Sequence, residues 1–409
     1  MDNSNSISAP IDTYDYIIAG AGCAGLSLLH YIIKDPLLSS KKVLVIDKSL
    51  NKTNDRTWCF WEYSKGSFEH LVKHQWETIS IHAPLFNKEL PTVPYCYKMI
   101  QGIDFYNDII KSASIHSNNV HWKEATITNM EVHHDLDQKY ASVYWQGGVA
   151  KAKIVFTSML PFQMNSLQSA HTFDTKKGDQ KSPPFLWQHF KGRVVHFEQS
   201  VFNEKVARLM DFNVPQQGAT AFMYLLPLNE KQALVEYTVF SDQILETAVY
   251  DHILDVYLNE AFPSHSYTIQ HEEVGAIPMT QQIFTEFAAP IYKIGAVGDA
   301  IKASSGYAFQ FIQQQCKNII EQLEKGKAID TSVHNTRHRF YDAVLLHILF
   351  YHKMNGAEIF KRIFAKNKAA TVFKFLSNTS SFWEDIQIMR SLPTRIFLPA
   401  ALLVLCRRG

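Results

Sequence analysis

The sequence predicts an α/β fold in which one domain, built from two distant parts of the chain, is interrupted by another. A strand–glycine loop–helix–strand pattern lies near the N-terminus, and a strand–Gly-Asp–helix pattern lies near residue 295. Alternating strand-like stretches fill the sequence between them. The chain has 409 residues, 46% of them apolar and 19% charged, which excludes global disorder and permits a large core.

The N-terminal pattern predicts a βαβ unit. Residues 14–19 (YDYIIA) form a continuous apolar run typical of a buried strand, and residues 24–34 carry apolar side chains at helical spacing. The pair Asp35-Pro36 ends the helix, and residues 43–47 (VLVID) predict the next strand. A βαβ unit of about 30 residues begins a Rossmann-like domain.

The loop between this strand and helix fits the pattern G-x-G-x-x-G. The first glycine permits a tight turn, the second lets a pyrophosphate approach the backbone, and the third lets the helix pack on the strand. The helix N-terminus adds unpaired N–H groups and a positive dipole end. Asp47 follows Gly25 by 22 residues, where an acid can bind ribose hydroxyls. The pattern predicts a dinucleotide site formed by Gly20, Ala21, Gly22, Cys23, Ala24, Gly25 and Asp47.

The second pattern distinguishes between dinucleotides. A strand expected at 291–297 runs into GAVGDA (295–300), and a helix is expected at 306–323. This motif resembles the distal motif of glutathione-reductase-type flavoproteins, in which the aspartate contacts the ribityl chain of the flavin. The resemblance implies FAD rather than NAD and assigns Gly298 and Asp299 to cofactor binding. An ordinary helix N-cap is the alternative role for Asp299.

The p-hydroxybenzoate-hydroxylase group has the same arrangement, so the expected fold is a Rossmann-like FAD-binding domain of that type. In that group, the strand corresponding to 153–158 runs into an Asp-Gly motif. This chain continues there with Met159-Leu160, which counts against an NADPH-dependent hydroxylase.

The expected domain boundaries follow the two motifs. The FAD-binding domain takes 14–60 and 285–325, with part of 95–160. An inserted mixed-sheet substrate domain takes 61–284, with some strands of the FAD domain. The C-terminal region, 330–409, is expected to be helical.

Charge and cysteine content exclude several classes of protein. The net charge of +1 provides no general field for nucleic acid. The five cysteines are far apart and form no C-x-x-C pair, which favours a reducing, cytoplasmic compartment over a disulfide scaffold or zinc ribbon. The first 14 residues lack the pattern of a secretory signal. His334 and His338 have metal-ligand spacing without an evident third ligand, so no metal is expected.

Several segments resemble, in order, the lycopene cyclases of carotenoid biosynthesis. They are DYIIAGAGCAGLSL (15–28), RTWCFWE (56–62), FLWQHFKGRVV (185–195), RLMDFNV (208–214), FMYLLPL (222–228), ALVEYTVFS (233–241) and GDAIKASSGYAFQFI (298–312). The tail at 380–403 is similar to the bacterial branch, the lycopene beta-cyclase type. The resemblance implies cyclisation of the ends of lycopene to beta-ionone rings without net redox change, with FAD reduced by NAD(P)H.

Two other functions remain open at this point. One is a flavin-dependent oxidoreductase, a reductase or monooxygenase, that acts on another isoprenoid lipid. The other is a lipid-binding protein that FAD stabilises without catalysis.

Glu236 is the candidate catalytic residue. In the strand-like stretch 233–240, Glu236 and Thr238 point to one face while Val235, Tyr237 and Val239 point to the other. Burial between apolar neighbours raises the pKa of a carboxyl group and keeps its proton, as donation to an alkene requires. The resemblance matches Glu236 to the glutamate of the family's acidic motif, which often has a second acid where this chain has Tyr237. A glutamate at the rim of an edge strand is the alternative.

Other candidates carry weaker signals. Trp58, Phe60 and Trp61 could line a polyene tunnel and stabilise a carbocation, or pack in the core. Arg56 could reach the cofactor phosphates or lie in a solvated loop. Asp211 matches a position of the family, although a turn explains it equally well.

The C-terminal region suggests a membrane surface. Residues 337–376 contain eight basic and two acidic side chains among many apolar ones, which suits an anionic leaflet. The uncharged run 396–406 is too short to span a bilayer but could enter the interface. We expect peripheral attachment to the cytoplasmic membrane; a solvated helical face is the alternative.

Overall fold

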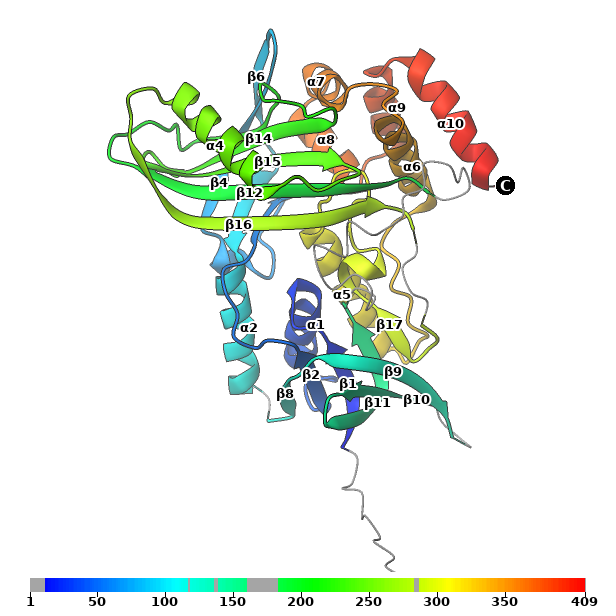
Figure 1. The fold of residues 1–409 in the computed structure, drawn as a ribbon. Helices are drawn as coiled ribbons and strands as arrows, with labels where there is room; N and C mark the ends of the chain where they lie inside the picture. The colour runs from blue at the N-terminus through cyan, green and yellow to red at the C-terminus, as the bar shows by residue number, and fades with distance from the viewer. Residues whose placement is uncertain (1–11, 117, 136–138, 160–182, 283–286, 409) are drawn as a thin grey trace, which may run out of the picture.

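The computed structural model describes residues 12–116, 118–135, 139–159, 183–282 and 287–408. A first sheet, low in Figure 1, has the strand order β8-β2-β1-β11-β10-β9, and β17 also pairs with β11. Its strands are β1 (Thr13–Ala19), β2 (Val43–Asp47), β8 (Val120–Glu124), β9 (Ile127–His134), β10 (Lys139–Trp145), β11 (Gly148–Thr157) and β17 (Ile291–Lys293).

The first sheet contains the predicted βαβ unit. Strands β1, β2, β8, β11 and β17 pair in parallel, as a Rossmann-like sheet requires. Helix α1 (Cys23–Lys34) connects β1 to β2 and packs beside α5 (Phe309–Glu324). Helix α1 ends just before Asp35-Pro36, as expected. Ile18, Val45 and Ile319 are fully buried in the core that these elements share.

Two predictions about this sheet are wrong in detail. The strand-like pattern of 120–132 predicts one strand of a separate small sheet, together with 141–145 and 153–158. The stretch 120–132 is instead two strands, β8 and β9, at opposite edges of the first sheet. Between these strands, the Ala125 N–H donates to the Asp47 carbonyl at 2.8 Å. After Ala125 the chain moves away from β2 to form β9 at the opposite edge.

The strand expected at 291–297 is shorter than predicted. It ends at Lys293, and Gly295–Gly298 form a 3₁₀ turn, η3. Gly295 has φ +67°, which lies outside the range of regular β-strands, and its N–H donates to Gln315 Oε1 at 2.7 Å. Helix α5 begins at Phe309 rather than at 306.

A second sheet, higher in Figure 1, has the order β16-β12-β15-β14-β13-β5-β6. Helix α4 (Thr247–Ala261) covers one of its faces, where Val235, Tyr237 and Val239 are buried. The strands are β5 (Thr78–Ala83), β6 (Phe86–Pro91), β12 (Phe185–Phe197), β13 (Val206–Asp211), β14 (Thr220–Asn229), β15 (Gln232–Ser241) and β16 (Tyr267–Thr280).

A third, smaller sheet has the order β3-β7-β4 and is followed by a helix, α2 (Gly102–His116). The strands are β3 (Thr57–Glu62), β4 (His74–Trp76) and β7 (Cys96–Gln101), and a 3₁₀ turn, η1 (Glu69–Leu71), precedes β4. Trp76 and Tyr97 of this sheet belong to the same buried core as the second sheet.

The C-terminal region is helical, as predicted. Helices α6 and α7 contact the second sheet, and α10 packs on α6 at the periphery of the molecule (Figure 1). Among the described residues, no helix has both the length and the apolar character needed to cross a membrane. The helices are α6 (Thr336–Phe350), α7 (Gly356–Lys366), α8 (Ala369–Leu376), α9 (Phe382–Arg390) and α10 (Thr394–Arg408). The predicted fold class is therefore confirmed: a Rossmann-like α/β sheet, an inserted mixed sheet and C-terminal helices.

Candidate active site

A cavity of about 360 Å³ lies between the carboxyl end of the first sheet and one face of the second sheet. Ser158, which follows β11, and Ala296 and Val297 of η3 line it from the first sheet. Glu236 of β15 and Glu273 of β16 line it from the second sheet. In parallel α/β sheets, ligands bind beyond the carboxyl ends of the strands, so this cavity lies where such a sheet presents a ligand.

Glu236 lies in the cavity wall, as the strand alternation predicts. It is partly accessible from the cavity, and Thr238 Oγ1 donates to its Oε1 at 2.7 Å. Burial, and after it the charge of the nearby Glu273 carboxyl group, raises the pKa of Glu236 to about 8. The carboxyl group can therefore keep a proton at neutral pH.

Tyr237 faces away from this cavity. Its side chain is fully buried under α4, and its hydroxyl donates to the Pro215 carbonyl at 2.5 Å. The position where the family often has a second acid thus lies on the opposite face of β15 from Glu236.

Glu273 is a site residue that sequence reasoning missed. In the second sheet, Gly192 of β12 is paired with Glu236 on one side and with Glu273 on the other. Thr57 Oγ1 donates to Glu273 Oε2 at 2.7 Å, and burial raises the pKa of this carboxyl group too. Its neighbour Glu272 faces the other side of the sheet. No local pattern identifies Glu273, because its position depends on β12 lying between two strands distant in sequence.

Arg56 lies beside these carboxyl groups. Its Nη1 donates to the Val274 carbonyl at 3.0 Å, and its charge opposes the rise in the pKa of both Glu236 and Glu273. Arg56 was expected either beside the cofactor phosphates or in a solvated loop. The structure places it at the carboxyl pair.

The three predicted aromatic residues separate into two groups. Trp58 lines the cavity, with its ring stacked 6.0 Å from that of Phe309. Phe60 and Trp61 are buried, and Trp61 stacks on Phe373 with ring centroids 4.5 Å apart. Of the three, Trp58 is therefore the one that can contact a ligand in this cavity.

The glycine loop has the geometry that its motif predicts. Gly20 has φ +107°, and a Cβ there would lie 2.4 Å from Ser158 Oγ. A Cβ on Gly25 would lie 1.9 Å from the Gly20 carbonyl oxygen, so this glycine permits the close approach of α1 to β1. At Gly22, a Cβ would meet no atom within 4 Å. Open space therefore lies before the N-terminus of α1, where no side chain caps the helix.

The residues present fit a flavin dinucleotide at this end of the sheet. Asp47 lies at the end of β2 beside the glycine loop and accepts a hydrogen bond of 2.5 Å from the Ala21 N–H. A Cβ on Gly298 would lie 2.5 Å from the Lys293 carbonyl oxygen. Space for a pyrophosphate, free helix N–H groups and an acid placed for a ribose thus occur together. The side chain of Cys23 is half-buried against the core that contains α1, and desolvation raises the pKa of its thiol to about 12.

Asp299 follows η3 with φ +62°, and its carboxylate is ion-paired with Arg339 of α6. The alternative role as an N-cap is wrong, because the N-cap of α5 is Ala308. Asp299 does not line the cavity, although Ala296 and Val297 of the preceding turn do.

The remaining candidates have structural partners. Asp211 is buried and accepts hydrogen bonds from Arg208 and Tyr257. The ring of His338 is hydrogen-bonded to Asn335 and Ser380, and that of His334 is hydrogen-bonded to Asn378. Within the described ranges, no three histidine, cysteine or acidic side chains form a group that could hold a metal ion.

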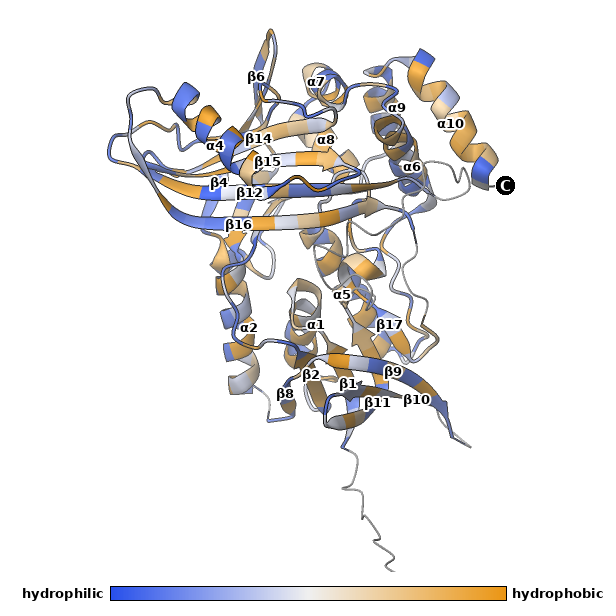
Figure 2. Ribbon diagram, in the orientation of Figure 1, coloured by the Kyte–Doolittle hydropathy of each residue, from blue (hydrophilic) through white to orange (hydrophobic). Residues whose placement is uncertain are grey.

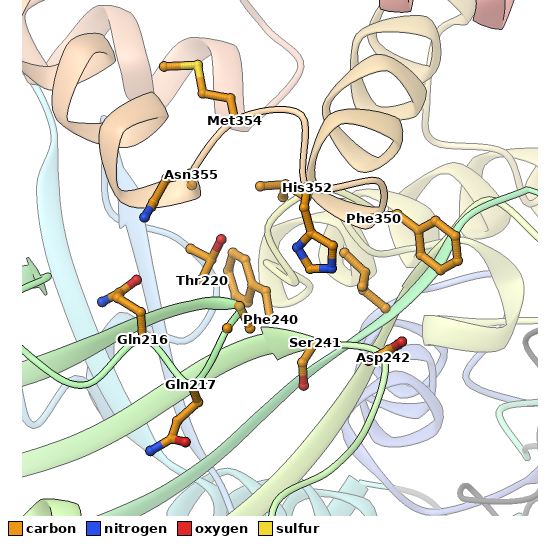
Figure 3. A pocket seen from close by; sticks show the side chains of 15 residues that line it. Gln216, Gln217, Thr220, Phe240, Ser241, Asp242, Phe350, His352, Met354 and Asn355 are labelled. Atoms are coloured by element: carbon orange, nitrogen blue, oxygen red, sulfur yellow. The ribbon is translucent and has the colours of Figure 1, made fainter. Parts of the chain in front are cut away.

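A second cavity of about 360 Å³ lies at the other end of β15, against the loop between α6 and α7. Figure 3 shows the side chains of His352, Thr220 and Ser241 around it. None of the predicted site residues lines this cavity.

Comparisons with known proteins agree with this architecture. A family model described as "Lycopene cyclase protein" matches residues 15–401. No curated protein matches the sequence. The chain is similar in structure to a geranylgeranyl bacteriochlorophyll reductase-like protein from Thermoplasma acidophilum, with TM-score 0.54, 13% identity, and coverage of 97% of this chain and 100% of that one.

It is also similar to p-nitrophenol 4-monooxygenase PnpA from Pseudomonas putida DLL-E4, with TM-score 0.56, 11% identity and coverage of 98% and 99%. A probable FAD-dependent monooxygenase, PqsL from Pseudomonas aeruginosa, gives TM-score 0.53, 11% identity and coverage of 93% and 100%. At these identities the structural likeness shows the fold alone.

Proposed function

Since the chain belongs to the lycopene cyclase family, we propose that it is a lycopene beta-cyclase, an isomerase that closes the ends of lycopene into beta-ionone rings. The observation that carries this proposal is a carboxyl group, Glu236, that keeps its proton in an apolar-walled cavity at the end of a Rossmann-like sheet. A protonated acid facing an apolar substrate is what alkene protonation needs.

The reaction is balanced in protons and electrons. The Glu236 O–H bond breaks as its proton forms a C–H bond at the terminal double bond, which leaves a carbocation. A second double bond then attacks this cation and closes the ring, and loss of a ring proton to a carboxylate restores the alkene. The substrate gains one proton and loses one proton, so the product is an isomer of the substrate.

Aromatic side chains lie where the cation would form. Trp58, Tyr307 and Phe309 line the same cavity as Glu236. The face of an aromatic ring attracts a cation by roughly 0.5–2 kcal/mol, most strongly where water is excluded. These rings therefore favour the carbocation over the neutral polyene.

We propose that FAD, reduced by NAD(P)H, binds at the glycine loop. Gly20, Ala21, Gly22, Cys23, Ala24 and Gly25 would hold its pyrophosphate, Asp47 its ribose, and Gly298 and Asp299 the ribityl side. When bound, reduced flavin supplies negative charge that stabilises a nearby cation. Asp299 would have to exchange its ion pair with Arg339 for the ribityl chain or bind both.

The direct test is expression in bacteria that accumulate lycopene, with pigments separated by chromatography. The wild type should convert lycopene to beta-ringed product, and Glu236→Gln should leave lycopene unchanged while still binding FAD. Glu230→Gln, in the exposed turn between β14 and β15, is the matched control and should cyclise normally.

Other outcomes of this test contradict the proposal. Consumption of one NADPH for each lycopene changed would indicate an oxidoreductase acting on an isoprenoid lipid. A yellow, FAD-containing protein that leaves lycopene unaltered would indicate a lipid-binding protein without catalysis.

We also propose that the protein attaches to a membrane surface through α9 and α10. Helix α10 is largely apolar between hydrophilic ends (Figure 2). The exposed apolar side chains of the two helices are Phe382, Trp383, Met389, Leu398, Leu402, Leu403 and Leu405. Arg390, Arg395 and Arg407 are exposed beside them, so the surface combines apolar contact with positive charge, as an anionic leaflet favours.

A further inference from the structure

Glu236 and Glu273 face each other across a gap in the second sheet. Each is paired in register with Gly192 of β12, which lies between their strands. A Cβ on Gly192 would lie 3.4 Å from Glu236 Cβ and 3.2 Å from Glu273 Cγ, so the absent side chain leaves room for both. The Glu273 carboxyl group is near enough to Glu236 to raise its pKa. Two carboxyl groups that approach each other can share one proton in a hydrogen bond.

The surroundings of the two groups are nearly symmetrical. Thr238 Oγ1 donates to Glu236 Oε1 and Thr57 Oγ1 donates to Glu273 Oε2, each at 2.7 Å. One oxygen of each carboxyl group is therefore bound by a hydroxyl. Both groups line the cavity in which we propose that the polyene binds.

The pair has few charged neighbours. Arg56 is the cation that acts on both groups, and His271 of β16 and Asp55 act on Glu273. The neutral titratable groups near Glu236 are Cys59 of β3, Tyr224 of β14 and Tyr307. Because Arg56 is the cation that lowers the pKa of both buried carboxyl groups, it favours one negative charge on the pair, hence one shared proton.

We propose that Glu273 is a second catalytic residue of the cyclisation, which shares one proton with Glu236 and takes part in recovering the proton that ring closure releases. This inference rests on the proposed function. In the resting site the pair holds one proton and one negative charge. Donation from Glu236 breaks its O–H bond and leaves two carboxylates facing the carbocation. Loss of the ring proton to either carboxylate restores the pair, so each turnover begins and ends in the same state.

The test compares the pH dependence of cyclisation in the wild type and in Glu273→Gln, with reduced FAD and lycopene in vesicles. The substitution removes one of the two carboxylates that can take the ring proton, and with it the negative charge beside Glu236. We expect cyclisation at neutral pH to be about 10²-fold slower, with the alkaline loss of activity displaced by about one pH unit to lower pH. If Glu273 had a purely structural role, the substitution would lower the yield of folded protein without changing the pH at which activity is lost on the alkaline side.

A second readout is independent of turnover. Infrared spectra of the FAD-free protein at neutral pH should contain the C=O band of a protonated carboxylic acid, which isotopic labelling of glutamate shifts. In Glu273→Gln this band should disappear at a lower pH than in the wild type, because Glu236 loses the charge that opposes its ionisation. A wild-type spectrum without the band would overturn the shared proton.

Gly192→Ala provides a geometric variant that keeps both carboxyl groups. Its Cβ would enter the gap between them at 3.2–3.4 Å, a contact that small side-chain shifts can relieve. We expect slower cyclisation and the same displacement of the infrared titration. Ala261→Ser, an equally small change at the exposed C-terminal end of α4, is the control and should keep both properties.

Failure of the two proposals would be distinguishable. A wild type that binds FAD yet leaves lycopene unchanged would contradict the proposed function, and the catalytic role of Glu273 with it. The inference alone would be contradicted if the wild type cyclised lycopene and Glu273→Gln did so at the same rate, with activity lost at the same alkaline pH.

Discussion

At the scale of single residues, the site depends on two carboxyl groups whose pKa values are raised by burial. The orientation of Glu236 could be predicted, because ALVEYTVF alternates and the faces of a strand follow from its sequence. The structure places Val235 and Tyr237 under α4 and Glu236 in the cavity, as the alternation predicts. Glu273 could not be predicted, because strand order in a sheet depends on pairing between distant segments.

Glu236→Gln should stabilise the protein while abolishing cyclisation. The pKa of Glu236 is raised on folding, so the unfolded chain ionises first as pH rises, and stability is lost between the ordinary pKa and about 8. A glutamine does not titrate. The variant should therefore gain on the order of 1–3 kcal/mol in free energy of unfolding near pH 8 and almost nothing near pH 4.

Urea-induced unfolding at the two pH values measures this difference. Equal stability of wild type and variant at both values would show that Glu236 carries no raised pKa. Glu230→Gln, whose glutamate is exposed, should show no gain at either pH.

At the scale of elements, short-range signals predicted the nucleotide end of the fold. Apolar runs, the glycine loop and Asp35-Pro36 are local features, so β1, α1 and β2 agree with expectation. The errors occur where tertiary contacts override the local pattern. Gly295, whose φ is positive, follows the end of β17, and its N–H donates a hydrogen bond to the Gln315 side chain of α5, which the hydropathy of 291–297 does not show.

Gly22→Ala should leave the fold intact and weaken FAD binding. Its φ of −89° is accessible to alanine, and a Cβ there meets no protein atom, so the methyl group enters only the space proposed for the pyrophosphate. We expect a Kd for FAD at least about tenfold higher in a fluorescence titration, with unchanged thermal stability of the FAD-free protein.

Gly25→Ala is the informative contrast. Its Cβ would lie 1.9 Å from the Gly20 carbonyl oxygen, so the FAD-free protein itself should be destabilised. If Gly22→Ala bound FAD as tightly as the wild type, the pyrophosphate would not lie at this glycine.

At the scale of the whole molecule, the Rossmann-like sheet and the mixed sheet enclose the cavity, and the C-terminal helices lie at one side (Figure 1). The sequence indicated the basic, apolar character of the C-terminal region. The structure adds the outward direction of the leucines. Leu398, Leu402 and Leu405 lie along one face of α10 and are each more than half exposed, whereas Ala400 and Val404 are buried against the protein. Helical spacing alone cannot show which face a terminal helix buries.

Leu402→Glu combined with Leu405→Glu should abolish attachment to vesicles that contain anionic phospholipid. Each substitution replaces an exposed apolar contact by a negative charge, which an anionic surface repels. Flotation of the purified protein with such vesicles measures attachment. Leu37→Glu, an exposed leucine just beyond α1, is the control and should leave attachment unchanged. Equal flotation of the double variant and the wild type would place the membrane contact elsewhere.

The most direct measurement is the mass of the product that the purified protein, with reduced FAD, forms from lycopene in vesicles prepared in D₂O. Carboxyl protons exchange with D₂O between turnovers, so Glu236 donates a deuteron that stays in the ring while a ring proton leaves. The account therefore predicts a beta-ringed product that has gained one deuterium for each ring closed. In H₂O the product should have the mass of lycopene. A product heavier than lycopene in H₂O, or a ring closed in D₂O without deuterium, would contradict acid-initiated cyclisation by this protein.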